Sequence, residues 1–140
     1  MFDRTADALV GVYRKLIALN KSVNDYTEPI ARHGEEERAE RGRILLSKFQ
    51  EFEQEYFPNK IYIPKGTAEK IRVFNNTLHS IVLNFQMAQA VDTSRVKDPA
   101  IIEQRHQKLE ELFAKAPDLL SALEDDFQKV LGFPIEEQKK

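Results

Sequence analysis

The residues of this chain that come nearest to a metal site are Glu103 and His106. On a helix, their separation by three positions places both side chains on one face. In four-helix bundles, two such Glu-x-x-His pairs, with a glutamate from each of the other two helices, hold a pair of iron or manganese ions. The chain has no second pair, because Asn76 stands where a glutamate would precede His79. We therefore predict no metal site and interpret His106 as a histidine on a helix flank near solvent.

The chain also lacks the patterns of a nucleophilic, acid–base or phosphate-binding site. None of its serines lies in a Gly-x-Ser-x-Gly turn, and the absence of cysteine excludes a cysteine nucleophile. The five glycines are scattered instead of forming a phosphate-binding loop. Carboxylates are abundant, but nothing in their spacing pairs two of them for catalysis. We assign no catalytic, cofactor-binding or metal-ligating residue and no cofactor. Enzymatic activity stays undecided, and a non-enzymatic role is favoured.

The balance of charge gives no general attraction to nucleic acid. With 21 basic and 23 acidic residues the formal net charge is −2, whereas nucleic-acid binding calls for a basic stripe or a recognition motif. The densest basic group, Arg38, Arg41 and Arg43, is interleaved with Glu37 and Glu40. We therefore predict no nucleic-acid partner.

The N-terminus has neither the apolar run of a signal peptide nor that of a membrane span. Charged residues interrupt it: Asp3, Arg4, Asp7, Arg14 and Lys15. No later run is apolar enough to cross a bilayer. We predict a soluble, cytoplasmic chain without direct membrane insertion, and the lack of cysteine is compatible with a reducing compartment.

Apolar residues at alternating steps of three and four predict the helices that would position these side chains. The first helix is expected over residues 3–27 and the second over residues 35–56, with a break in residues 28–35 at Pro29 and Gly34. The first helix has the longest seam: Leu9, Val12, Leu16, Leu19, Val23, Tyr26 and Ile30. The second helix has the stripe Ala39, Gly42, Leu45, Leu46, Phe49, Phe52 and Tyr56. Its glycine is expected to permit close approach of a neighbouring helix.

The third helix is expected over residues 67–91, with Thr67 as its N-cap or with an extra first turn from Pro64. Its stripe is Ile71, Phe74, Leu78, Ile81, Phe85 and Ala88. Asn20 in the first helix and Asn75 in the third adjoin the apolar stripes. Either they are buried polar contacts that set the helix register, or they lie on partly exposed flanks. The sequence leaves both interpretations open.

The fourth helix begins at Asp98, which is a good N-cap before a proline, and it ends near Gly132. Pro117 is expected to kink this helix or to divide it in two. The predicted domain covers residues 1–134, and a charged C-terminal tail follows over residues 135–140. Four amphipathic segments with short connections predict an all-α, antiparallel, up-down-up-down four-helix bundle.

The connector from Tyr56 to Pro64 is unusually apolar for a loop. Two prolines bracket its centre, and neither can continue a helix without losing a backbone hydrogen bond. We predict that Phe57, Ile61 and Ile63 are anchored in the core. The connector would then fix how the second and third helices pair.

Three groups of residues together resemble a set of uncharacterised bacterial helical-bundle domains. They are the heptads at Tyr13, Leu16 and Leu19, then Phe49, Phe52 and Tyr56 leading into residues 59–63, and the closing residues 123–132. Such domains often follow an N-terminal membrane anchor and face the cytoplasm. The resemblance implies that residues 1–4 are similar to the region after an anchor, and it brings no catalytic residues.

We interpret the chain as a non-enzymatic interaction or scaffold bundle that binds an unknown protein partner or self-associates through a helix face. One alternative is a small-ligand-binding or enzymatic bundle with a pocket between helices near Pro29 or Pro117. Another is the cytoplasmic domain of a membrane-anchored protein.

Overall fold

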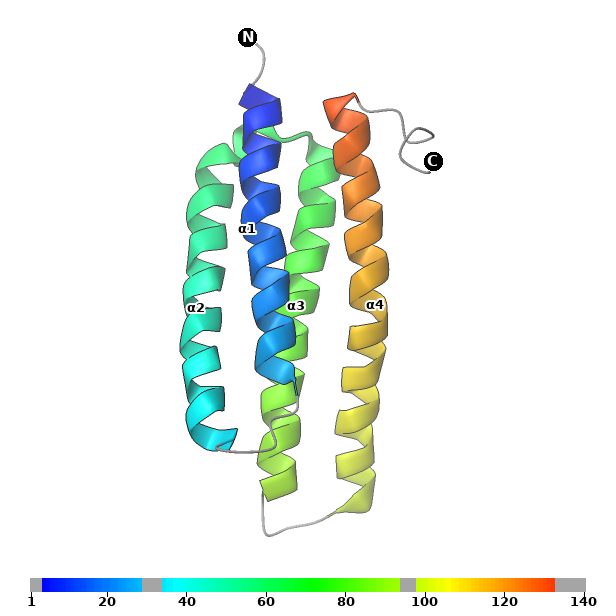
Figure 1. Ribbon diagram of the computed structural model, residues 1–140. Helices are drawn as coiled ribbons and strands as arrows, with labels where there is room; N and C mark the ends of the chain where they lie inside the picture. Colours follow the sequence, from blue (N-terminus) through cyan, green and yellow to red (C-terminus); the bar gives the residue numbers. More distant parts are fainter. Residues whose placement is uncertain (1–3, 29–33, 94–97, 133–140) are drawn as a thin grey trace, which may run out of the picture.

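The computed structural model describes residues 4–28, 34–93 and 98–132, with the side chains of residues 91–93 excepted. These residues form four long helices and one short 3-10 helix: α1 (Arg4–Thr27), α2 (Gly34–Asn59), η1 (Lys60–Tyr62), α3 (Lys65–Thr93) and α4 (Pro99–Leu131). Successive helices run antiparallel, so the start of α1 and the end of α4 lie at the same end of the bundle (Figure 1). The predicted all-α four-helix bundle is confirmed.

The two ends of α4 are set by the predicted signals. The Asp98 side chain accepts a hydrogen bond from the Ala100 backbone N–H at 3.0 Å, and Pro99 occupies the first turn. At the other end Gly132 adopts a left-handed conformation with φ 87°, which a glycine takes without strain.

Pro117 does not divide α4, so of the two predicted alternatives, a kink or a split, the split is wrong. The helix is continuous from Pro99 to Leu131, and Figure 1 shows an unbroken ribbon. Apolar residues on both sides of Pro117, including Leu112 and Leu120, pack against the core, while Pro117 itself is exposed. Because water can reach the carbonyl that the proline leaves unpaired, packing on both sides is enough to keep the helix together.

Thr67 is not the N-cap of α3. The helix begins at Lys65, and its first turn closes when the Ala68 N–H donates to the Pro64 carbonyl at 2.9 Å. Thr67 therefore lies inside the helix, where it is buried. The predicted alternative, an extra turn from the proline, is the correct one.

The core is a single cluster in which α1 is central. Its seam residues Leu9, Val12, Leu16, Leu19 and Val23 have no exposed surface. The backbone contacts are most extensive between α1 and α2 and between α3 and α4, and α1 contacts α3 more extensively than it contacts α4. Helices α1 and α3 therefore form the short diagonal of the bundle. The α1–α4 and α2–α3 flanks are left more open.

The buried face of α2 is narrower than its stripe predicts. Leu45 is buried, but Leu46 is 60% exposed and Ala39 is exposed as well. Because α2 has extensive backbone contacts with α1 and few with α3, one line of side chains is enough to fill the main contact. Gly42 does serve close approach as predicted, since a Cβ there would lie 3.3 Å from the Tyr26 ring.

The connector between α2 and α3 is only partly anchored. Ile63 is buried, with 6% of its surface exposed, but Phe57 is 62% exposed and Ile61 is 81% exposed. The prediction that all three lie in the core is therefore wrong for Phe57 and Ile61. The reason is that α2 continues through Pro58 to Asn59 and keeps Phe57 on its outer face.

Tyr62, which was not singled out from the sequence, holds the connector in place. The Arg4 guanidinium donates to the Tyr62 hydroxyl at 2.7 Å, and the Thr5 hydroxyl donates to the Tyr62 carbonyl at 2.9 Å. The anchor of the connector is thus Ile63 in the core and Tyr62 against the start of α1.

Candidate functional site

The residues considered for a metal site do not come together. Glu103 and His106 are both exposed on α4. Across the described ranges 4–28, 34–93 and 98–132, no group of three or more His, Cys, Asp or Glu side chains could hold a metal ion. His33 and Pro29, the latter named as a possible pocket position, lie outside those ranges.

His79 is a packing residue. Its ring stacks on Phe49 with 4.1 Å between ring centroids and 22° between planes. Burial lowers the pKa of His79, and the nearby charge of Glu53 only partly opposes this shift. The stack on Phe49 therefore favours the neutral imidazole, although His79 as a whole residue is still exposed.

Two arginines of the basic group on α2 contact the last turn of α1, whereas Arg43 is exposed and pairs with Glu40. Arg38 donates to the Tyr26 backbone carbonyl, and its guanidinium lies 4.8 Å from the centre of the Phe85 ring. Arg41 donates to the Asp25 carbonyl at 2.6 Å. These arginines satisfy carbonyl groups that the last turn of α1 leaves unpaired.

Two grooves lie on the open flanks of the bundle, and they are the candidate sites. The α1–α4 groove has a volume of about 650 Å³ and the α2–α3 groove about 400 Å³. Pro117 lines neither of them, so these grooves differ from the pocket predicted beside that proline. The grooves follow from the short diagonal between α1 and α3, which no local pattern in the sequence reveals.

One end of the α2–α3 groove is formed by the exposed side chain of Phe57. Phe57 forms part of its wall, together with Lys60 and Lys65. Ile61 follows Phe57 by four positions, in η1, and is exposed as well. We call the four residues Phe57, Lys60, Ile61 and Lys65 the α2–α3 corner. All four are exposed, and within the described part of the chain neither lysine has a carboxylate oxygen within 4 Å.

One polar atom beside this groove has no partner. The Oδ1 atom of Asn75, a groove-lining residue, is buried without a hydrogen bond among the described residues. An unpaired buried carbonyl is unfavourable by about 1–3 kcal/mol. As whole residues, Asn75 and Asn20 are both half-buried, which fits partly exposed flanks better than buried contacts that set the register.

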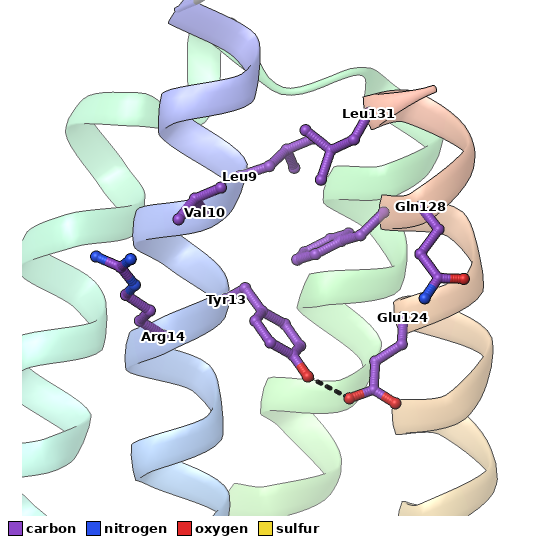
Figure 2. Close-up of a pocket in the computed structure, with 8 residues that line it drawn as sticks. Leu9, Val10, Tyr13, Arg14, Glu124, Gln128 and Leu131 are labelled. Atoms are coloured by element: carbon purple, nitrogen blue, oxygen red, sulfur yellow. Dashed lines mark hydrogen bonds between the residues drawn. The ribbon is translucent and has the colours of Figure 1, made fainter. Parts of the chain in front are cut away.

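The α1–α4 groove carries a polar pair on an apolar wall. Figure 2 shows Tyr13 of α1 reaching across to Glu124 of α4, and the Tyr13 hydroxyl donates a hydrogen bond to that carboxylate. The Tyr13 ring also meets Phe127 edge-on, with 5.7 Å between centroids. Burial, the hydrogen bond to Glu124 and the charge of Glu124 raise the pKa of Tyr13 to about 12. Sequence reasoning missed this pair, because 111 positions separate its members.

No helix in the described ranges is both long enough and apolar enough to cross a membrane. Comparison of the chain with protein-family models, with curated proteins and with solved structures finds no match. The resemblance to bacterial helical-bundle domains therefore stays a prediction.

Proposed function

We propose that this protein is a non-enzymatic interaction module that binds another protein at the α2–α3 corner. The observation that carries this proposal is the exposure of Ile61, at 81%, beside Phe57, at 62%. Burying a large apolar side chain of this kind contributes about 1.5–3 kcal/mol. Exposed apolar side chains that adjoin a groove are typical of partner-binding surfaces.

The charges around the corner favour an acidic partner. Lys60 and Lys65 flank the apolar side chains without carboxylate partners in the described structure. A two-fold contact between copies of this chain would bring like charges together at this corner. A different protein, with carboxylates around an apolar centre, fits better than a second copy.

The α2–α3 groove that opens at the corner supports the same direction, because a partner segment can enter it beside the exposed apolar side chains. We place this interaction in the cytoplasm, because a chain with no cysteine suits a reducing compartment.

Site-directed photo-cross-linking in cells tests the proposal. Benzoylphenylalanine replaces Ile61 in one version and Leu83 in the control, which is 55% exposed on α3 and several turns from the corner. We expect a discrete adduct with one other protein from position 61 and none from position 83. Phe57→Asp should weaken the affinity for that purified protein at least about tenfold, as loss of a central apolar contact does.

Three outcomes would contradict the proposal. They are equal labelling from positions 61 and 83, an adduct with lipid alone, and an adduct only with a second copy of this chain.

A further inference from the structure

The α1–α4 groove has the size of a ligand site and lies away from the α2–α3 corner. Its volume of about 650 Å³ falls within the range of about 300–1,000 Å³ that is usual for small-molecule sites. It exists because α1 makes few close backbone contacts with α4. The two helices instead share α3 as their common neighbour, which leaves the side chains between them free to line an open cleft.

Polarity changes along this groove. Towards the shared end of α1 and α4 it is lined by the apolar side chains of Leu9, Phe127 and Leu131. About two turns further along α4, Tyr13 and Glu124 meet across it (Figure 2). Leu131 and Glu124 are seven residues apart, which is about 10 Å on a helix. This is the reach of a medium-length alkyl chain.

The polar end carries an uncompensated negative charge. Within the described part of the chain, the Glu124 carboxylate accepts a hydrogen bond from Tyr13 and has no Lys, Arg or His nitrogen within 4 Å. Arg14 also lines the groove, but its side chain extends on the other side of α1, away from Glu124 (Figure 2).

We propose that the α1–α4 groove binds an amphiphile with a single alkyl chain and a cationic amine head group. The alkyl chain packs along Leu131 and the surface of the apolar wall, behind which Leu9 and Phe127 are buried. The ammonium group donates to the Glu124 carboxylate and to the Tyr13 oxygen, which keeps its acceptor lone pairs while its hydrogen points at Glu124. An anionic head group would instead meet a carboxylate at the polar end.

Calorimetric titration with octylammonium and octanoate, both below their micelle-forming concentrations, tests which head-group charge the groove prefers. The two probes share nearly the same chain length and differ in head-group charge. We expect octylammonium to bind at least about tenfold more tightly, since one unscreened charge contact near a protein surface is enough for such a factor. Glu124→Gln should remove most of this preference, and the exposed Glu110→Gln on the same helix should leave it intact.

Chemical-shift mapping by NMR locates the probe and shows that each variant is folded. Octylammonium should shift the resonances of Tyr13 and Leu131 and leave those of Ile61 unchanged. Equal affinity for the two probes would overturn the proposal. So would a preference that survives Glu124→Gln, or shifts confined to the α2–α3 corner. None of these results bears on the protein partner proposed for that corner.

Discussion

Ile61 and Ile63 are separated by two positions and have opposite environments. Ile61 is 81% exposed in the short helix η1, whereas Ile63 is 6% exposed and belongs to the core. The chain turns between them, where the Ile63 N–H donates to the Lys60 carbonyl at 3.1 Å. The two residues have the same side chain, so substitution at each separates the effect of position from that of chemistry.

At this scale we predict that Ile63→Asp strongly destabilises the protein and that Ile61→Asp does not. The first change removes a buried side chain and places a carboxylate in the core, which should lower the free energy of unfolding by several kcal/mol. The second alters an exposed side chain and should stay within about 0.5 kcal/mol of the parent. Urea unfolding followed by circular dichroism measures both. A large loss for Ile61→Asp would show that the connector packs differently.

The carboxylate of Asp126 links α4 to the first turns of α3. Asp126 of α4 accepts hydrogen bonds from the Thr67 hydroxyl at 2.5 Å and from the Lys70 ammonium at 2.8 Å, both on α3. Burial alone would raise the pKa of Asp126, but the hydrogen bonds from Lys70 and Thr67 outweigh it and hold the pKa below its usual value. These contacts fix the axial position of α4 against α3.

At the scale of the helix pair we predict that Asp126→Asn lowers the free energy of unfolding by about 1 kcal/mol at pH 7, because a charge-assisted hydrogen bond becomes a neutral one. The pKa of Asp126 is lower in the folded protein, so its stabilisation is fully present above pH 3.8, the ordinary value. It is lost as the pH falls through the folded value. The difference between variant and parent should therefore shrink below about pH 4. Urea unfolding at pH 7, 4 and 3 checks this.

The exposed Asp118 on α4 provides the matched control. Asp118→Asn should leave stability unchanged at every pH. A difference between Asp126→Asn and the parent that is constant with pH would contradict the role of the charge.

On the scale of the whole molecule, the short diagonal between α1 and α3 decides what is buried and what is open. The seam of α1, whose length suggested dimerisation through a helix face, is used within the chain's own core. The same arrangement leaves a groove on each flank and the α2–α3 corner at one end. Surfaces for partners are therefore expected on the flanks and at the corner, away from the helix seams.

We accordingly predict a monomer of 16.2 kDa at tens of micromolar, because the α1 seam has no apolar surface left for a second copy and the lysines of the corner would repel each other. Static light scattering measures the mass. A dimer that dissociates on Ile61→Asp would show self-association through the corner instead of binding to an acidic partner.

Helix propensity, capping and apolar periodicity act over one or two turns, so the helices and most of their inward faces could be predicted from local sequence. The seams of α1 and α3, the cap at Asp98 and the end at Gly132 could all be predicted on that basis. Exposure of Leu46 could not be predicted, because the width of a buried face depends on how many neighbours a helix has.

Which helices approach closely depends on the packing of the whole bundle, and so do the positions of the grooves and the side chains that meet in them. Tyr13 and Glu124 are 111 positions apart, and their pairing depends on the spacing of α1 and α4, which the packing of both helices on α3 sets. The exposure of Phe57 and Ile61 likewise depends on α2 continuing past Pro58. Local patterns record the face that a residue occupies, but the partner that a face meets is set by the packing of all four helices together.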